Sequence, residues 1–340
     1  MRRFGDVFRV RTTEADYVLK PLNKSRRRAR YVCALMEYLA QGDHGLTPAL
    51  ARTADGGVMV SENRRRHWIL CEWIGGRTCE WDDLTDARFS AAALGRFHCA
   101  ARGRHPGPGE SPKAYWHTWP EKLALRLTML EQYVAEAKGR LAGGEGTRYD
   151  EVAAAAAPRQ LALARRSLEV LLESDYSELC REAQACHQII HGDPAGRNFV
   201  VTEYGQTRII DLETTRGDII ALDVAKMLRR ALKKHRWRPR VAEDLLTAYG
   251  REAPLPGAMM PVVWTFLAFP TKYYRDLERY YESRPGWSYR RHLYKLRKHL
   301  RGGARHDRLL DWFAERYLGR RDRRRQIGAG GGGDESGSGL

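Results

Sequence analysis

Two short stretches of the chain contain residue types that could transfer a phosphoryl group. His191-Gly192-Asp193-Pro194-Ala195-Gly196-Arg197-Asn198 places an acid and an amide five residues apart, and Ile210-Asp211-Leu212-Glu213 supplies another acid. Asp193 is predicted to accept the proton of an attacking hydroxyl group as a general base. Asn198 and Asp211 offer the hard oxygen ligands that Mg²⁺ prefers. Together they predict a site that holds a magnesium–nucleotide complex against a hydroxyl acceptor.

The same residues also have an ordinary structural explanation. Asp193 and Asn198 would then only cap a turn, and Asp211 would end a strand by chance. A short strand hairpin predicted between the two stretches favours the catalytic interpretation, because it returns the chain to the loop. His191 is interpreted as bracing the loop. Glu213 is interpreted either as a contact for a second metal or substrate or as an exposed residue, with neither preferred.

Five further residues are assigned by their positions. Lys20 ends an apolar strand, where a lysine can reach nucleotide phosphates as a point charge or simply extend into solvent. Glu37, seventeen positions later in a predicted helix, is the candidate ion-pair partner of Lys20, with a surface role equally open. Glu72 and Ile74 follow a strand, where a hinge would offer backbone groups to an adenine ring. Asp223, at a helix start, is predicted to brace the catalytic loop.

Apolar periodicity predicts the elements that would position these residues. Strands precede a mostly helical remainder, and the Gly/Ser-rich end from 328 to 340 is predicted to be disordered. The predicted strands cover 8–12, 17–20, 58–60, 67–73, 199–201 and 208–210, and the predicted helices cover 25–41, 89–101, 121–141, 158–174 and 176–186.

This order predicts an α+β chain of 340 residues with three parts. Residues 1–73 form an N-terminal nucleotide-binding lobe, residues 74–318 form a larger helical catalytic lobe, and residues 319–340 form a basic and then Gly/Ser-rich tail. Only nineteen residues precede Lys20, so at most one strand and part of a phosphate-covering loop are expected there. The small lobe is therefore predicted to be truncated at its N-terminus: either the chain starts late, or this protein binds nucleotide poorly.

Composition excludes several other classes of protein. The formal net charge is +17, which could serve nucleic acid, an anionic surface or phosphorylated substrates. The basic runs are scattered and no nucleic-acid-binding motif accompanies them, so a solvated basic surface is preferred and a nucleic-acid partner ranks last. The six cysteines show no metal-ligand spacing. No apolar run is long enough to span a membrane and no signal peptide is evident, so cytoplasmic synthesis is expected.

The two catalytic stretches, with Lys20 and Asp223, resemble the aminoglycoside-phosphotransferase-type branch of the protein-kinase-like superfamily. Within that branch the chain resembles the spore-coat CotS-type family over about residues 5–318. Three stretches carry this closer resemblance: Tyr17-Val18-Leu19-Lys20-Pro21; Trp116-His117-Thr118-Trp119-Pro120; and Phe269-Pro270-Thr271-Lys272-Tyr273 with Tyr280-Tyr281 and Gly286-Trp287-Ser288.

The resemblance implies a bilobal kinase-like fold and a role in the spore coat after synthesis in the mother cell. It implies that Asp193 is the base, that Asn198 and Asp211 are the metal ligands, and that Lys20 clamps the phosphates. The function expected is therefore ATP- and Mg²⁺-dependent transfer to an unknown hydroxyl acceptor, with other coat proteins as partners. The alternative is a structural coat protein that keeps the fold without turnover.

Overall fold

The structure, a computed structural model, describes residues 2–4, 6–41, 45–283 and 286–319. The chain divides into two compact units that each combine distant parts of the sequence. Unit 1 consists of Met1–Lys122 with Asp175–Leu255, and unit 2 consists of Leu123–Ser174 with Pro256–Leu340. All the residues assigned above to chemistry lie in unit 1. The lobe boundary placed at residue 73 remains a prediction.

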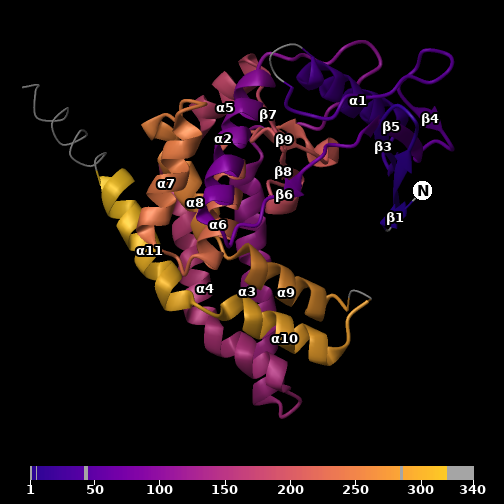
Figure 1. The fold of residues 1–340 in the computed structure, drawn as a ribbon. Helices are drawn as coiled ribbons and strands as arrows, with labels where there is room; N and C mark the ends of the chain where they lie inside the picture. Colours follow the sequence, from indigo (N-terminus) through magenta and orange to yellow (C-terminus); the bar gives the residue numbers. More distant parts are fainter. Residues whose placement is uncertain (1, 5, 42–44, 284–285, 320–340) are drawn as a thin grey trace, which may run out of the picture. The chain divides into compact units, whose positions relative to one another are not determined.

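Unit 1 begins with an antiparallel sheet of five strands in the order β1-β2-β3-β5-β4 (Figure 1). Its strands are β1 (Arg2–Phe4), β2 (Val7–Arg11), β3 (Asp16–Leu22), β4 (Val60–Ser61) and β5 (His67–Glu72). The expectation that at most one strand precedes the lysine strand is wrong, because both β1 and β2 come before β3. Strand β1 has only three residues, and all three pair with β2, from Arg2↔Arg9 to Phe4↔Val7.

Helix α1 (Arg26–Ala40) follows β3 and supplies much of the core beside the sheet. Tyr31, Val32, Leu35 and Leu39 recur at helical spacing and are all fully buried. The helix ends close to its predicted limits.

The rest of unit 1 is built from helices and three short strand pairs that surround the catalytic stretches. Strands β6, β8 and β9 form one small sheet, and β7 pairs with β10 in another. The elements are β6 (Arg77–Thr78), α2 (Leu84–Ala100), α5 (Tyr176–Ala185), β7 (Ile189–Ile190), η2 (Gly196–Asn198), β8 (Phe199–Val201), β9 (Thr207–Ile209), η3 (Leu212–Thr214), β10 (Arg216–Gly217), α6 (Ala221–Lys234) and α7 (Pro239–Gly250). The predicted hairpin before Asp211 is therefore confirmed as β8 and β9.

Unit 2 is helical in the part that the structure describes. Helix α4 packs against α8 and α10, and α9 runs beside α10 (Figure 1). Its elements are α3 (Trp119–Ala142, entering from unit 1), α4 (Arg148–Glu173), η4 (Gly257–Met259), α8 (Met260–Ala268), α9 (Thr271–Tyr281), α10 (Tyr289–Leu300) and α11 (Gly303–Tyr317).

Helix α4 is longer than the sequence analysis expected, because it begins at Arg148 and contains Pro158 in its interior. A capping box starts it: the backbone N–H and the hydroxyl of Thr147 both bond Asp150. The alanine run before Pro158 continues the helix, as expected for the residue with the highest helix propensity. The predicted disordered end, 328–340, lies outside the described residues. Among those that are described, no helix has the length and apolar character needed to cross a bilayer.

Candidate active site

The loop that carries Asp193 leaves the buried strand β7 through Gly192. This glycine has a φ of +84°, and a Cβ atom there would lie 2.4 Å from the carbonyl oxygen of Thr214. Such a close approach to backbone requires a residue without a side chain. Gly192 therefore lets the loop turn tightly against the segment that follows Asp211.

His191 is buried and connects the two catalytic stretches. Its Nε2 lies 3.1 Å from the carbonyl oxygen of Ile210, and its Nδ1 accepts the backbone N–H of Asp193 at 3.2 Å. This pattern fixes the neutral tautomer with the proton on Nε2. Burial lowers the pKa of His191, although the nearby carboxylates of Asp223, Asp211 and Asp193 oppose that effect. The prediction that His191 braces the loop is confirmed.

Asp223 of α6 holds the same loop from the other side. Its buried carboxylate accepts the backbone N–H of His191 at 2.7 Å and that of Gly192 at 3.1 Å, and lies 3.3 Å from Nε2 of His98. Burial alone would raise the pKa of Asp223, but these donors and the charge of Lys226 hold it well below its usual range. The predicted bracing role of Asp223 is confirmed, although it binds amides of the catalytic loop and not those of its own helix start.

Two basic residues that the sequence analysis missed share this face of α6. Lys226 donates to the carbonyl oxygen of Gly192 at 2.7 Å, and Arg230 donates to that of Pro194 at 2.6 Å. Burial lowers the pKa of Lys226 to about 8, even though the carboxylate of Asp223 raises it. Asp223, Lys226 and Arg230 are spaced i, i+3 and i+7, which places them on one side of a helix. This spacing relative to Asp223 was the sequence signal that could have identified Lys226 and Arg230.

Asp193 is held by two guanidinium groups, one on each carboxylate oxygen. Arg230 Nη2 lies 2.5 Å from Oδ1, and Arg197 Nη2 lies 2.7 Å from Oδ2. Burial would raise the pKa of Asp193, but the hydrogen bond and charge of Arg230, followed by the charge of Arg197, lower it. The carboxylate is therefore ionised at neutral pH, as a proton acceptor must be.

We predict that the two arginines differ in their effect on turnover. Arg230 makes two bonds to the loop and is partly buried, whereas the side chain of Arg197 is 69% exposed and binds the loop through Asp193 alone. Arg230→Gln is expected to reduce kcat by about tenfold or more, because a charge-assisted bond that orients the base is lost. Arg197→Gln, which removes the same charge, is expected to stay within about twofold. Steady-state kinetics of both variants test this, and equal losses would contradict it.

Asn198 ends the 3₁₀ turn η2 and is almost fully buried. Its amide nitrogen donates to the backbone oxygen of Asp193 at 2.9 Å, so its side-chain oxygen remains the accepting atom. Its own carbonyl accepts the N–H of Ile210 at 2.9 Å. Asn198 is therefore tied to the residue before Asp211 as well as to Asp193.

Asp211 stands in the left-handed backbone region, with φ 66° and ψ 58°. For a residue with a side chain this conformation costs roughly 1–3 kcal/mol and is concentrated at functional sites. Lys20 Nζ lies 3.5 Å from Asp211 Oδ1 and 3.3 Å from Glu213 Oε1. Lys20 from β3 thus reaches the segment that carries Asp211.

Lys20 is not a solvated lysine at a strand end, because its side chain is only 13% exposed. Burial would lower the pKa of Lys20, but the carboxylates of Asp211 and Glu213 raise it above its usual value. Lys20 therefore remains a cation. Of the two interpretations left open for Glu213, simple exposure is excluded by its ion pair with Lys20 and its 23% exposed side chain.

The ion pair expected between Lys20 and Glu37 is not the one that the structure shows. Glu37 Oε1 lies 2.6 Å from Arg52 Nη2, while Lys20 pairs with Asp211 and Glu213. The physical reason is that an arginine that follows α1 offers Glu37 a partner, and Lys20 already has two carboxylates. A nucleotide-binding role for Glu37 stays a prediction.

Glu72 ends β5, and the chain continues through Ile74 without regular structure. The carboxylate of Glu72 binds Arg208 at 2.7 and 2.9 Å. The backbone N–H of Glu72 donates to the carbonyl oxygen of Ala49 at 2.8 Å. These groups hold the end of the strand, so a hinge contact by that N–H would have to displace Ala49. Ile74 keeps its predicted position after the last strand of the sheet, and its hinge role stays a prediction.

The donor set fits a hard divalent cation. Asn198 presents an amide oxygen and Asp211 a partly exposed carboxylate, and Lys20 beside Asp211 suits phosphate. In the described part of the chain, no group of three or more His, Cys, Asp and Glu residues could hold a metal ion. Mg²⁺ does not need such a cage, since it commonly keeps waters and binds one or two protein groups plus phosphate oxygens.

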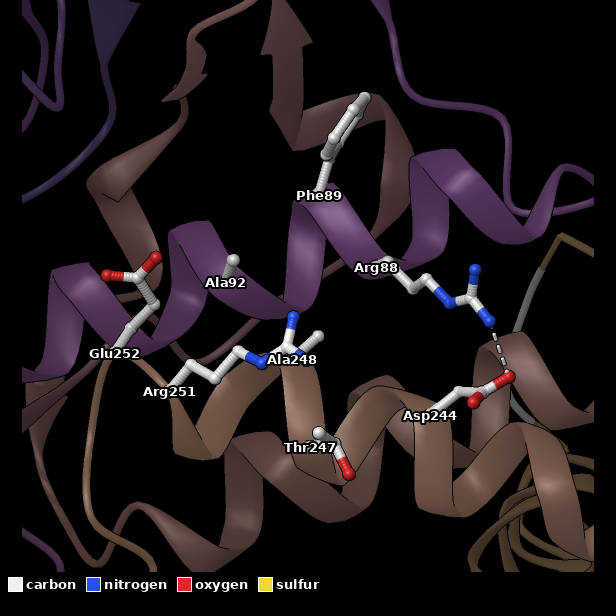
Figure 2. Close-up of a pocket in the computed structure, with 8 residues that line it drawn as sticks. All are labelled: Arg88, Phe89, Ala92, Asp244, Thr247, Ala248, Arg251 and Glu252. Carbon is white, nitrogen blue, oxygen red and sulfur yellow. Dashed lines mark hydrogen bonds and ion pairs between the residues drawn. The ribbon is translucent and has the colours of Figure 1, made fainter.

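A separate hollow of about 450 Å³ lies between α2 and α7, as Figure 2 shows. None of the residues assigned to chemistry lines it, and Arg88 and Asp244 form an ion pair of 2.7 Å at one end. The residues that line it are Arg88, Phe89, Ala92, Asp244, Thr247, Ala248, Arg251 and Glu252. It is therefore distinct from the candidate active site.

The N-terminal sheet carries the buried Lys20, and the braced loop with Asp193 and Asn198 is followed by Asp211. This combination defines a kinase-like phosphotransferase. Residues 5–262 match the model of the phosphotransferase enzyme family known as APH. The chain belongs to this family, and its predicted mixed α+β, kinase-like fold is confirmed.

Solved structures show the same fold at low sequence identity. An aminoglycoside phosphotransferase from Alicyclobacillus acidocaldarius is 17% identical with a TM-score of 0.81, over 93% of this chain and 92% of that one. The amicoumacin kinase hAmiN, in complex with AMP-PNP, Ca²⁺ and Ami, is 14% identical with a TM-score of 0.54, over 89% of this chain and 88% of that one. Spectinomycin phosphotransferase APH(9)-Ia, in complex with ADP and spectinomycin, is 11% identical with a TM-score of 0.50, over 86% and 84%.

Proposed function

We propose that this protein transfers the γ-phosphoryl group of ATP to a hydroxyl group of a small acceptor or a protein component. The observation that supports this most strongly is that hydrogen bonds of Asn198 connect Asp193 with the residue before Asp211. Asn198 donates to the backbone oxygen of Asp193 and accepts from Ile210, which directly precedes Asp211. Residues far apart in the sequence thus share one small region with Lys20.

In the proposed reaction Asp193 takes the proton of the acceptor hydroxyl group. The oxygen of that hydroxyl group forms a bond to phosphorus at the same time. The bond from phosphorus to the leaving oxygen of the nucleoside diphosphate breaks in the same displacement. Lys20 neutralises phosphate charge, and Arg230 keeps the carboxylate of Asp193 in position. Mg²⁺ bound by Asn198 and Asp211 would neutralise charge that develops on the phosphate oxygens.

We predict that Asp211→Ala abolishes the thermal stabilisation that Mg-ATP gives the wild-type protein. A ligand that binds only the folded state stabilises it by roughly 2.7 kcal/mol at one hundred times its Kd, and this gain should disappear with the ligating carboxylate. Thermal-shift measurements with ATP, with GTP and without Mg²⁺ test the site before any acceptor is known. Glu203→Ala, at an exposed turn, is the matched control and should keep the shift. An unchanged shift in Asp211→Ala would contradict the assigned metal site.

The resemblance to the CotS-type family supports a finer proposal, in which the protein acts in the spore coat with other coat proteins. A tagged copy expressed in a sporulating endospore former is then expected in the mother cell and later in the coat fraction. Its absence from the purified coat would count against this role.

One observation favours a second candidate, a coat protein that keeps the fold without turnover. Both carboxylate oxygens of Asp193 are already bound to guanidinium groups, which compete with an acceptor hydroxyl. Transfer or ATP hydrolysis that disappears in Asp193→Asn would dispose of this candidate.

A further inference from the structure

Unit 2 contains a cavity of about 510 Å³ that the proposed phosphotransfer does not use. Its volume lies within the range of small-molecule sites, roughly 300–1,000 Å³. Two of its residues, Lys272 and Trp287, come from the aromatic stretches that the catalytic interpretation leaves unexplained. The cavity is lined by Arg126 of α3, by Lys272, Tyr274, Arg275, Asp276, Glu278 and Arg279 of α9, by Trp287, and by His299 of α10.

Cations outnumber carboxylates in this lining by four to two. The four cations are Arg126, Lys272, Arg275 and Arg279. Asp276 pairs with His299 at 2.5 Å, and Glu278 accepts the hydroxyl of Tyr274 at 2.9 Å. By count the lining carries two more cations than carboxylates, so its net charge is positive.

Two of the arginines, Arg126 of α3 and Arg275 of α9, line the same cavity and repel one another. Burial lowers the pKa of Arg126 and repulsion from the guanidinium of Arg275 lowers it further, while the carboxylate of Glu278 opposes that effect. Two like charges that line one cavity, one of them partly out of water, raise the energy of the empty site. An anion placed between them would relieve that repulsion.

Trp287 forms a platform for Arg279, one of the four lining cations, and for Arg291, which is outside the lining. Arg279 lies 4.5 Å and Arg291 5.1 Å from the centroid of its ring. Such cation–π contacts fix a guanidinium in place while its N–H groups stay available for planar, forked bonds to an oxyanion. The arrangement reduces the ordering cost of binding a ligand with several negative charges.

We propose that this cavity binds a small polyanion that carries clustered phosphate groups. Phosphate is favoured because guanidinium forks match its oxygens and because several adjacent cations can each contact a separate charge. Two sources share this chemistry, a linear polyphosphate chain and a ring that bears phosphate esters. The site is separate from the proposed nucleotide site, whose residues all belong to unit 1.

The test is isothermal titration of the full-length protein with inorganic tripolyphosphate and with inositol hexakisphosphate, without Mg²⁺. At least one probe is expected to bind stoichiometrically, and Arg275→Gln is expected to weaken it by about tenfold or more. Arg305→Gln removes the same charge from an exposed position of α11 outside the cavity and should have little effect. The probe that binds more tightly identifies the chain or the ring as the preferred arrangement.

Further variants keep the proposal separate from the nucleotide site and from misfolding. Arg275 is exposed and repels Arg126, so its substitution should not lower the melting temperature, and Lys272→Gln provides a second variant in the same lining. Lys20→Gln should weaken Mg-ATP but not the polyanion. The proposal is overturned if neither probe binds, if Arg275→Gln and Arg305→Gln behave alike, or if only Lys20→Gln reduces polyanion binding.

Discussion

Asp193→Asn is expected to reduce phosphoryl transfer by about 10²–10⁴-fold, the usual contribution of a positioned general base. The amide is nearly isosteric with the carboxylate but cannot take the proton of an acceptor hydroxyl. Arg230 can still donate to the remaining oxygen, and the donor that loses its acceptor is then the exposed Arg197, so the loop should keep its shape. The measurement is the steady-state rate of ADP release, with and without an acceptor, together with the affinity for Mg-ATP.

Nucleotide affinity should change little in Asp193→Asn, because the assigned contacts to nucleotide and metal belong to Lys20, Asn198 and Asp211. Asp82→Asn is the matched control, since that exposed carboxylate pairs with Lys234 and has no assigned role in the site. A rate of ADP release within a few-fold of wild type would contradict the assignment of Asp193 as the base. A parallel loss of nucleotide affinity would show that the substitution damages the whole site.

The catalytic loop could be predicted because its chemistry is local. Asp193 and Asn198 are separated by a short turn, and the hairpin that carries the chain toward Asp211 has the alternation of a strand pair. The bracing roles of His191 and Asp223 were also accessible, since a buried loop needs partners for its backbone amides. These inferences depend on few residues and on short-range geometry.

The partners of charged side chains were harder to predict, because they depend on tertiary placement. Glu37 lies on the correct helix for a pair with Lys20, yet it binds Arg52, and Lys20 binds carboxylates about 190 positions away. Arg230 was missed because a basic residue in an Arg-rich chain carries little information until its loop partner is known. In a chain with a net charge of +17, almost any acid can find a cation.

The number of N-terminal strands was underestimated for a different reason. Strand β1 has only three residues and no apolar alternation, so its sequence does not distinguish it from a loop. Pairing with β2 supplies the hydrogen bonds that make it a strand. Local pattern therefore predicted β2 and β3, whereas the edge of the sheet depended on its neighbour.

Asp223→Asn is expected to cost about 3–5 kcal/mol of stability, as for breaking other buried, hydrogen-bonded charge pairs. The carboxylate of Asp223 accepts from the backbone of His191 and Gly192 and contacts His98, all in the interior. The amide of Asn has only one accepting oxygen. Its NH₂ group would face the N–H donors that the carboxylate now accepts, so at least one of those bonds would be lost. Chemical denaturation at pH 7 measures the loss, and Asp311→Asn, at an exposed position of α11, should stay within about 0.5 kcal/mol.

The loss in Asp223→Asn should also depend on pH, which separates the carboxylate charge from simple packing. The pKa of Asp223 is lowered in the folded protein, whereas an unfolded aspartate titrates near 3.9. The folded state therefore binds fewer protons, and the stabilisation from Asp223 is complete above about pH 4 and declines as the pH falls toward the folded-state pKa. Other acid-sensitive pairs affect wild type and variant alike, so the difference between the two proteins isolates this group. That difference should shrink between about pH 4 and pH 2; a constant difference would mean that shape, and not charge, makes Asp223 necessary for the catalytic loop.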